Sequence, residues 1–214
     1  MIPTTTFDTE TLPAPDSFKL LTSLVVPRPI AWITTQSPEG NLNAAPFSFF
    51  NLVSSNPVML AVGIACRPEG APKDTLGNIL ATKEFVIQIV TEDLVQQMNI
   101  TSIDAPLGIN ELDLAKLETV PSLKVSPPRI AGSPAAFECR LFHAVDTGHG
   151  NHVIIANIVQ VHIHTSAFLN LDKLYIDTPS LGIVGRMHGG GWYARTTDLF
   201  DLPRPKWPLE PPKE

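Results

Sequence analysis

Residues 24–57 constrain the fold of this chain more than any other segment, because they hold two apolar runs with a turn sequence between them. The first run covers residues 24–35 and carries a proline on each side of Arg28, and the second covers residues 42–53. Residues 37–41 read SPEGN, and proline, glycine and asparagine in such a cluster are typical of a turn. The pattern predicts two strands joined as a hairpin.

The second strand of this hairpin carries polar side chains among small and aromatic residues. Asn43, Ser48 and Asn51 are examples, and Ser54 and Ser55 follow directly after the strand. Burial of a polar group without a hydrogen-bond partner costs several kcal/mol. These side chains therefore need partners, which a bound ligand would supply.

The other segments predict a mainly β protein. Apolar runs and alternating patterns predict strands over residues 58–66, 84–90, 137–145 and 153–164. In the last strand, one face is expected to carry Val153, Ile155, Val159, Val161 and Ile163. Short helices are predicted over residues 74–82, which Asp74 and Thr75 can cap, after Thr91 as a further cap, and over residues 111–117. The 21 prolines limit helix length, so we predict a closed β-barrel with a few short helices.

Composition and charge exclude several classes of protein. Hydrophobic residues make up 43% of the chain and charged residues 17%, which indicates a folded domain rather than a disordered chain. The net charge of −6 disfavours nucleic acid as a partner, because that partner requires a basic surface. No secretory signal or membrane span is expected. Cys66 and Cys139 form no CxxC motif, so we expect two buried free thiols and a soluble, cytoplasmic protein.

Lys73, Asp74 and Thr75 stand at the start of a predicted helix. A helix N-terminus offers free N–H groups and the positive end of the helix dipole, which suit a phosphate, and a neighbouring lysine adds charge. The alternative is an ordinary helix cap with a solvated lysine. Arg28 favours the phosphate site over the ordinary cap. The flanking prolines stiffen its backbone, and a guanidinium binds phosphate in bidentate fashion.

Four segments in a fixed order resemble the flavin reductase-like, FMN-binding split-barrel family, which includes flavoredoxin-type proteins. They are VPRPIAWITT, NLNAAPFSFFN, SSNP and KDTLGNI. The resemblance spans residues 18–195 and is sharpest over residues 24–80. It implies a six-stranded Greek-key split barrel that forms a homodimer with FMN at the subunit interface.

The resemblance also implies roles for individual residues. The isoalloxazine ring would lie along Asn43, Ala45, Pro46, Phe47 and Ser48. The ribityl chain and phosphate would be held by Arg28, Asn51, Lys73, Asp74 and Thr75. Because Ala44 and Ala45 lack bulk, their backbone amides are expected to approach the polar edge of the ring. His188 and Tyr193 follow the last predicted strand and are candidates for the substrate pocket.

Three other motifs allow different interpretations. The HGGG run at His188 resembles an esterase oxyanion segment, but the chain has no GxSxG nucleophile motif. His162 and His164 are spaced to share one face of a strand, yet a metal site needs at least a third ligand, and we predict no metal. The GHG at Gly148 lacks the third glycine and the following helix of a dinucleotide-binding motif.

These features predict an FMN-binding oxidoreductase that passes electrons from NADH or NADPH through the flavin to an unknown acceptor. The acceptor is a small molecule, a partner oxygenase or another redox protein. The alternative is an FMN-carrying electron-transfer or flavin-binding protein without reductase turnover. No catalytic side chain is assigned, because hydride transfer depends on positioning and on the electrostatics of the ring. The predicted organisation is an N-terminal arm (1–17), the split-barrel domain (18–200) and a proline-rich tail (201–214).

Overall fold

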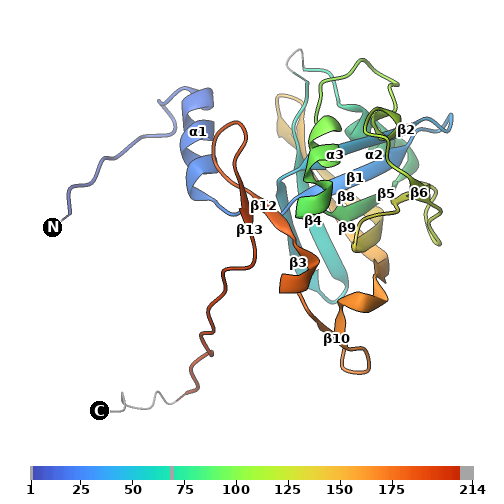
Figure 1. Cartoon of the computed structure of the whole chain (residues 1–214). Coiled ribbons are helices and arrows are strands. Elements are labelled where there is room, and N and C mark those ends of the chain that lie inside the picture. Colours follow the sequence, from blue (N-terminus) through green and yellow to red (C-terminus); the bar gives the residue numbers. More distant parts are fainter. Residues whose placement is uncertain (1, 68–69, 208–214) are drawn as a thin grey trace.

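The computed structural model describes residues 2–67 and 70–207 and shows a curled antiparallel sheet surrounded by short helices (Figure 1). The helices are α1 (Ala14–Leu24), α2 (Asp74–Thr82), α3 (Val95–Ile100) and α4 (Glu111–Leu114), and the 3-10 turns are η1 (Glu92–Leu94), η2 (Thr165–Ala167) and η3 (Pro179–Leu181). No helix in the described parts of the chain is long and apolar enough to cross a membrane.

The main sheet has seven strands in the order β2-β1-β5-β8-β9-β4-β3. Their bounds are β1 (Ala31–Gln36), β2 (Leu42–Phe47), β3 (Phe49–Ser55), β4 (Val58–Ile64), β5 (Glu84–Ile89), β8 (Ala135–Gly148) and β9 (Asn151–Ile163). Shorter pairs are formed by β6 (Thr119–Val120) with β7 (Arg129–Ile130), β10 (Phe168–Asn170) with β11 (Tyr175–Ile176), and β12 (Val184–Arg186) with β13 (Tyr193–Arg195). The predicted mainly β architecture with short helices is confirmed.

The sheet closes on itself at Ser48. β2 and β3 lie at opposite edges of the sheet, although only Ser48 separates them in the sequence. Two Cα–Cα steps span at most about 7.6 Å, so the two edges must meet at this residue. We call Phe47–Phe49 the seam. The single strand predicted over residues 42–53 is therefore two strands, which is why the main sheet has seven strands rather than six.

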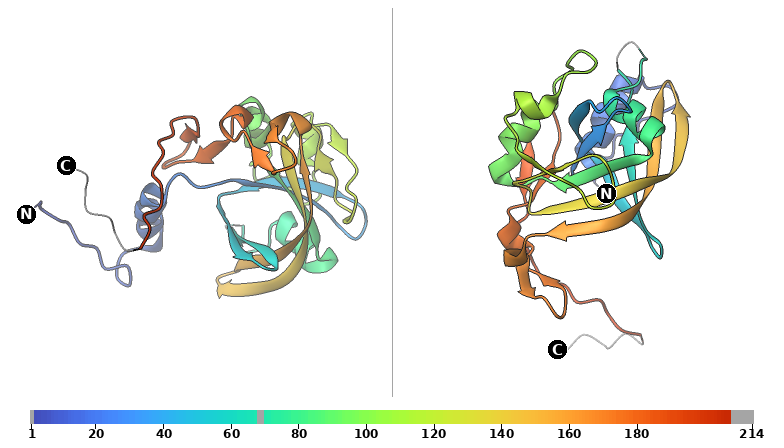
Figure 2. Two further views of the ribbon diagram at one scale, coloured as in Figure 1. Left: turned by 90° about the horizontal axis from the view of Figure 1, so that it is seen from below. Right: turned by 90° about the vertical axis from the view of Figure 1, so that its right-hand side faces the viewer.

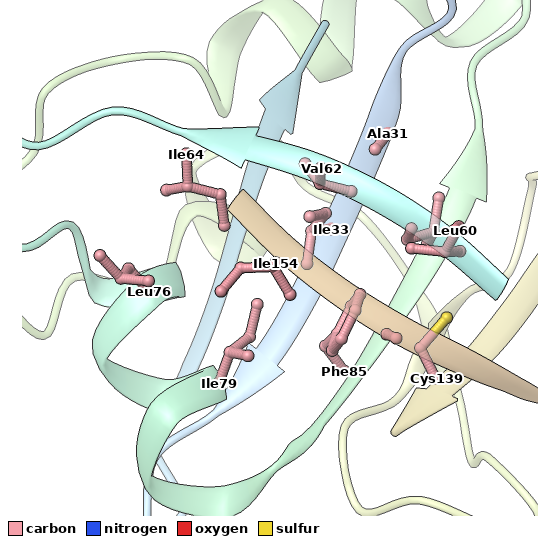
Figure 3. Close-up of a cluster of buried hydrophobic side chains, with 12 residues drawn as sticks. Ala31, Ile33, Leu60, Val62, Ile64, Leu76, Ile79, Phe85, Cys139 and Ile154 are labelled. Atoms are coloured by element: carbon pink, nitrogen blue, oxygen red, sulfur yellow. The ribbon is translucent and has the colours of Figure 1, made fainter. Parts of the chain in front are cut away.

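The interior of the barrel is filled by apolar side chains from five strands and α2. Leu76 and Ile79 of α2 lie against Ile154 and the neighbouring strand residues (Figure 3). Both are almost completely buried, as their helical spacing requires. This packing holds α2 in the barrel and brings the start of the helix close to β2.

A second apolar cluster on the outside of β1 holds α3 and α4. Trp32 is fully buried there, and its indole N–H donates to the hydroxyl of Thr101 at 2.9 Å. Met98 and Leu112 contribute from α3 and α4. A helix after Thr91 is present as predicted, although the Thr91 side chain makes no capping hydrogen bond. The cluster places α4 beside the free edge of β2.

The N-terminal region differs from the prediction. Residues 14–24 form α1, which crosses the predicted boundary between arm and domain, and the strand expected from Leu24 begins only at Ala31. Pro27 and Pro29 have no N–H to donate to a ladder, so this stretch pairs only through an isolated bridge between Arg28 and Arg186. Figure 2 shows α1 at the side of the barrel.

The C-terminal tail is extended and exposed as far as Trp207. The remainder of the predicted tail, residues 208–214, lies outside the described residues. Both cysteines are free, as predicted, but Cys66 is only half-buried whereas Cys139 is buried.

Candidate functional site

A cavity of about 300 Å³ lies at the seam. It is bounded by α1, the seam, β4 and the loop between β12 and β13. Of the predicted cofactor-binding residues, it is lined by Arg28, Pro46, Phe47, Ser48 and Lys73. Phe49 closes it from the other side of the seam, half-exposed and in edge-to-face contact with Phe18 at 6.0 Å between ring centroids. The cavity therefore combines the aromatic walls of Phe18, Phe47 and Phe49 with three cationic side chains, those of Arg28, Lys73 and Arg186.

A second cavity of about 60 Å³ adjoins the first at the start of α2. Pro46, Phe47 and Lys73 line both cavities, so the two share a wall. The predicted residues that line only the smaller one are Asn43, Ala45, Asp74 and Thr75. Its volume accommodates a few water-sized groups. The structure thus brings together the predicted cofactor-binding residues with the exception of Asn51.

Asn51 lies on β3 with an exposed side chain and lines neither cavity. Its side-chain oxygen accepts a hydrogen bond from the backbone N–H of Leu52 at 2.8 Å. Asn43 and Ala45 also differ from expectation, because both line the smaller cavity and not the larger, ring-sized one.

The N-terminus of α2 has no side-chain cap, which differs from the capping expected of Asp74 and Thr75. The Thr75 hydroxyl donates to Asn43 Oδ1 at 2.7 Å instead. Asp74 Oδ2 accepts from the backbone N–H of Gly108 at 3.3 Å. The first backbone N–H groups of the helix are therefore left without a side-chain acceptor, which is the arrangement that binds anions.

Arg67 is a cation of the smaller cavity that sequence reasoning missed. One of its Nη atoms donates to the carbonyl oxygen of Ala105 at 2.9 Å, and the other lies 3.8 Å from Asp74 Oδ2. Its Nε is buried and has no hydrogen-bond partner among the described residues. Lys73 stands beside it, with Nζ 3.3 Å from Asp104 Oδ1. The feature of the sequence that could have indicated Arg67 is its position as the first residue of the Pro- and Gly-rich loop before α2.

Arg28 has a different environment from the one predicted. Its guanidinium donates to the carbonyl oxygens of Thr22, Val25 and Met187 and to the Ser48 hydroxyl. Only 8% of the residue is exposed. Burial, and then the nearby charge of Arg186, lower the pKa of Arg28 from its ordinary value. Arg28 lines the larger cavity only, so the geometry favours a clamp on the scaffold over a phosphate ligand.

A buried hydrogen-bond network supports the free edge of β2. Glu111 Oε2 accepts from Asn43 Nδ2 at 2.9 Å and from the backbone N–H of Ala44 at 3.0 Å. Asn43 Oδ1 in turn accepts from the hydroxyls of Thr35 and Thr75. Burial raises the pKa of Glu111, and the hydrogen bonds that it accepts only partly oppose the rise. The Ala44 amide is thus occupied by Glu111 and is not free to meet a ring edge.

A third cavity, of about 210 Å³, lies on the other side of Pro46–Ser48. Tyr193 lines it, and the guanidinium carbon of Arg186 sits 4.9 Å from the centre of the Tyr193 ring. His188 lines neither this cavity nor the larger one at the seam; it is exposed and stacks on Trp192, with 6.0 Å between ring centroids. Of the two predicted substrate-pocket residues, the structure places Tyr193 at the site.

His162 and His164 do not form a shared pair. His162 Nε2 lies 2.6 Å from Glu138 Oε1, whereas His164 follows the end of β9. Within residues 2–67 and 70–207, no group of three His, Cys, Asp or Glu side chains is arranged to hold a metal ion.

A family model described as the flavin reductase like domain matches residues 23–178 of the sequence, which is most of the chain. The chain belongs to the flavin reductase like family. An uncharacterized relative from Deinococcus radiodurans is 38% identical over 204 residues, covering 94% of this chain and 89% of its own. The resemblance inferred from the ordered motifs is therefore confirmed.

Two solved structures support the same assignment. Nitrilotriacetate monooxygenase component B from Bacillus cereus is 30% identical, covers 94% of this flavin reductase-like chain and 100% of its own, and superposes with a TM-score of 0.87. A protein with a split barrel domain from Shewanella frigidimarina, 23% identical, shares the fold with a TM-score of 0.79 over 94% of this chain and 100% of its own. The predicted split barrel is confirmed, and the chain is a flavin-related oxidoreductase.

Proposed function

We propose that the chain binds FMN, with the isoalloxazine ring in the larger cavity and the phosphate in the smaller one. The observation that carries this proposal is the wall that the two cavities share at Pro46, Phe47 and Lys73. The larger cavity has aromatic walls, and the smaller one holds Arg67, Lys73 and the start of α2, which suits the two ends of a flavin mononucleotide. Pockets of roughly 300 Å³ or more are typical of small-molecule sites.

The residues present fit the phosphate group. The uncapped start of α2 and Lys73 supply donors and positive charge, and the buried Nε of Arg67, which has no hydrogen-bond partner among residues 2–67 and 70–207, favours an acceptor in the cavity. Buried polar atoms in proteins rarely lack partners, so an orphaned guanidinium nitrogen beside a cavity favours an anionic ligand there.

The residues at the seam fit the ring. Phe47 and Phe49 offer flat apolar surfaces, and Pro46 has no N–H that would need a partner at the edge of β2. When bound, the flavin would supply the redox chemistry, and the chain would supply binding, orientation and exclusion of water. The adjoining third cavity beside Tyr193 is the proposed docking place for NADH or NADPH, or for the electron acceptor.

We further propose that two copies of the chain form a homodimer and that the protein works in the cytoplasm. Support for the dimer comes from half-exposed apolar side chains on the β3 edge and at the start of β4, namely Phe49, Leu52, Val53 and Val58. Exposed apolar surface of this kind is typical of protein interfaces. The similarity to a monooxygenase component B supports an oxygenase as one candidate acceptor.

The deciding experiment follows the flavin absorbance of purified protein loaded with FMN. Under anaerobic conditions, added NADH or NADPH should bleach the visible flavin band on the timescale of turnover. Bleaching by dithionite but by neither nicotinamide would favour the alternative, an FMN-carrying electron-transfer protein. Protein that retains no added FMN would contradict both.

A further inference from the structure

Glu111 is a buried carboxylate in the wall of the smaller cavity. Only 5% of the residue is exposed, although it lies on the short helix α4 near the surface. Both hydrogen bonds that tie it to β2, from Asn43 Nδ2 and from the Ala44 amide, end on the same oxygen atom, Oε2. Because one oxygen atom accepts both hydrogen bonds, a substitution can keep these bonds while it removes the charge of Glu111.

Acidic side chains outnumber basic ones in the lining of the smaller cavity. Arg67 lies near Asp74, and Lys73 pairs with Asp104, and all four side chains line the same cavity. No cation within 4.0 Å partners Glu111 in the described part of the chain. An ionised Glu111 therefore adds an uncompensated negative charge to the proposed phosphate pocket. Its own helix adds Asp113 and, just beyond, Lys116, both exposed.

We propose that Glu111 is a positioning residue for the flavin-binding edge of β2 and that its charge determines how strongly the site prefers phosphorylated over unphosphorylated flavin. This inference rests on the proposed function. The positioning role follows from its bonds: Oε2 fixes the Ala44 backbone and orients Asn43, and Asn43 Oδ1 then holds Thr75 at the start of α2. One carboxylate thus connects the strand beneath the ring to the helix beneath the phosphate.

The specificity role follows from electrostatics. A carboxylate that shares a small, partly dehydrated cavity with a phosphate repels it, and the repulsion disappears when the carboxylate is protonated. Riboflavin, which lacks the phosphate, does not experience this repulsion. At high pH, where Glu111 is ionised, the ratio of FMN affinity to riboflavin affinity should therefore be smaller. The reference is the ratio that the cations of the cavity would give without the charge of Glu111.

Two variants separate the two roles. Glu111→Gln can place its amide oxygen where Oε2 accepts both hydrogen bonds, so it keeps the positioning and removes the charge. Glu111→Ala removes both. The probes are FMN and riboflavin, with affinities measured from quenching of flavin fluorescence between pH 5.5 and 8.5, and thermal melts of each variant without ligand report on folding.

At pH 8.5 we expect Glu111→Gln to bind riboflavin like the wild type and to show an FMN-to-riboflavin affinity ratio about tenfold higher. The difference should shrink as the pH falls, because burial raises the pKa of Glu111 and a protonated Glu111 no longer repels the phosphate. A phosphate monoester takes up its second proton near pH 6, which weakens the same repulsion and acts in the same direction. Glu111→Ala should bind both flavins at least about tenfold more weakly, because two donors of β2 lose their acceptor.

Equal affinity ratios for the wild type and Glu111→Gln across the pH range would overturn the specificity role. Riboflavin binding by folded Glu111→Ala at the wild-type affinity would overturn the positioning role. Either result leaves the FMN site itself intact. Failure of the wild type to bind FMN or riboflavin at any pH would instead overturn the proposed function, and this inference with it.

Discussion

The guanidinium of Arg28 donates a hydrogen bond from Nε to the hydroxyl of Ser48, 3.3 Å away, at the point where the barrel closes. Its other nitrogens bond the carbonyl oxygens of Thr22 and Val25 at the end of α1 and of Met187 in the loop between β12 and β13. Arg28 therefore holds three separate segments of the chain around the seam, and the shape of the larger cavity depends on it.

Substitution of Arg28 is expected to affect stability and both flavins together. Arg28→Ala removes charge-assisted hydrogen bonds to buried carbonyl groups and should lower the free energy of unfolding by roughly 2–3 kcal/mol. Affinity for FMN and riboflavin should fall in parallel, because the walls of the ring cavity loosen. Denaturant melts and fluorescence titrations measure both effects. If the stability of Arg28→Ala were unchanged and only its affinity for FMN fell, Arg28 would have the phosphate-binding role predicted from the sequence.

Substitution of Lys73 or Arg67 is expected to act on the phosphate alone. Lys73→Ala and Arg67→Ala should each weaken FMN binding by roughly 1.5–3 kcal/mol, the scale of a hydrogen bond to a charged group. Riboflavin affinity should change little in either variant. Lys173→Ala, at an exposed lysine of the turn between β10 and β11, is the matched control for loss of one positive charge. FMN binding that survives both site variants would place the phosphate elsewhere.

The ordered motifs were sufficient to predict the fold, and most of the residues that they single out line the two cavities at the seam. The sequence did not reveal the break at Ser48, since residues 42–53 read as one continuous strand. When the chain passes directly from a strand at one edge of a sheet into a strand at the opposite edge, no local sequence pattern marks the change. Only the pairing of β2 with β1 and of β3 with β4 distinguishes the two strands.

The alternation in β9 also did not indicate which face of the strand is buried. Val153 and Ile155 were expected to share one face, and Ile154 and Ala156 are the residues that face the core. Both faces of this strand carry apolar side chains, so period two alone cannot choose between them, and irregularities in the pairing with β8 shift the register. Glu111 was missed for a related reason, because no pattern in the sequence indicates that its helix packs beside β2.

Ala45 provides a steric test of the smaller cavity. The cavity measures about 60 Å³ and Ala45 is half-buried in its wall, so the larger side chain of Ala45→Leu should occupy the space proposed for the phosphate. FMN affinity should fall by at least about tenfold, while the melting temperature changes by only a few degrees, because the cavity takes up the added methyl groups. Normal FMN binding by this variant would show that the phosphate lies elsewhere. Ala71→Leu, in the loop before α2 and outside the residues lining the cavity, is the control.

Glu138 makes the stability of the barrel dependent on pH. The residue is fully buried on β8, and its oxygens accept from the backbone N–H groups of Leu123 and Lys124 and contact His162. Burial alone would raise the pKa of Glu138, but these hydrogen bonds outweigh it and the net pKa is lowered. A carboxyl group with a lowered folded-state pKa stabilises the fold above its unfolded pKa of about 4.3, and that contribution is lost as the pH falls through the folded value.

Glu138→Gln is therefore expected to remove a contribution that is present above about pH 4.3 and is lost in acid. At pH 7 the variant should lose at least about 2 kcal/mol of unfolding free energy, because an amide nitrogen replaces an oxygen that accepted a backbone N–H. Between pH 5 and pH 3 the wild type should lose stability faster than the variant, so the two curves converge. Thermal melts across this range measure the convergence, with the exposed Glu39→Gln as control. Parallel curves would mean that Glu138 titrates alike in the folded and unfolded chains, and its hydrogen bonds would then contribute nothing to the pH dependence.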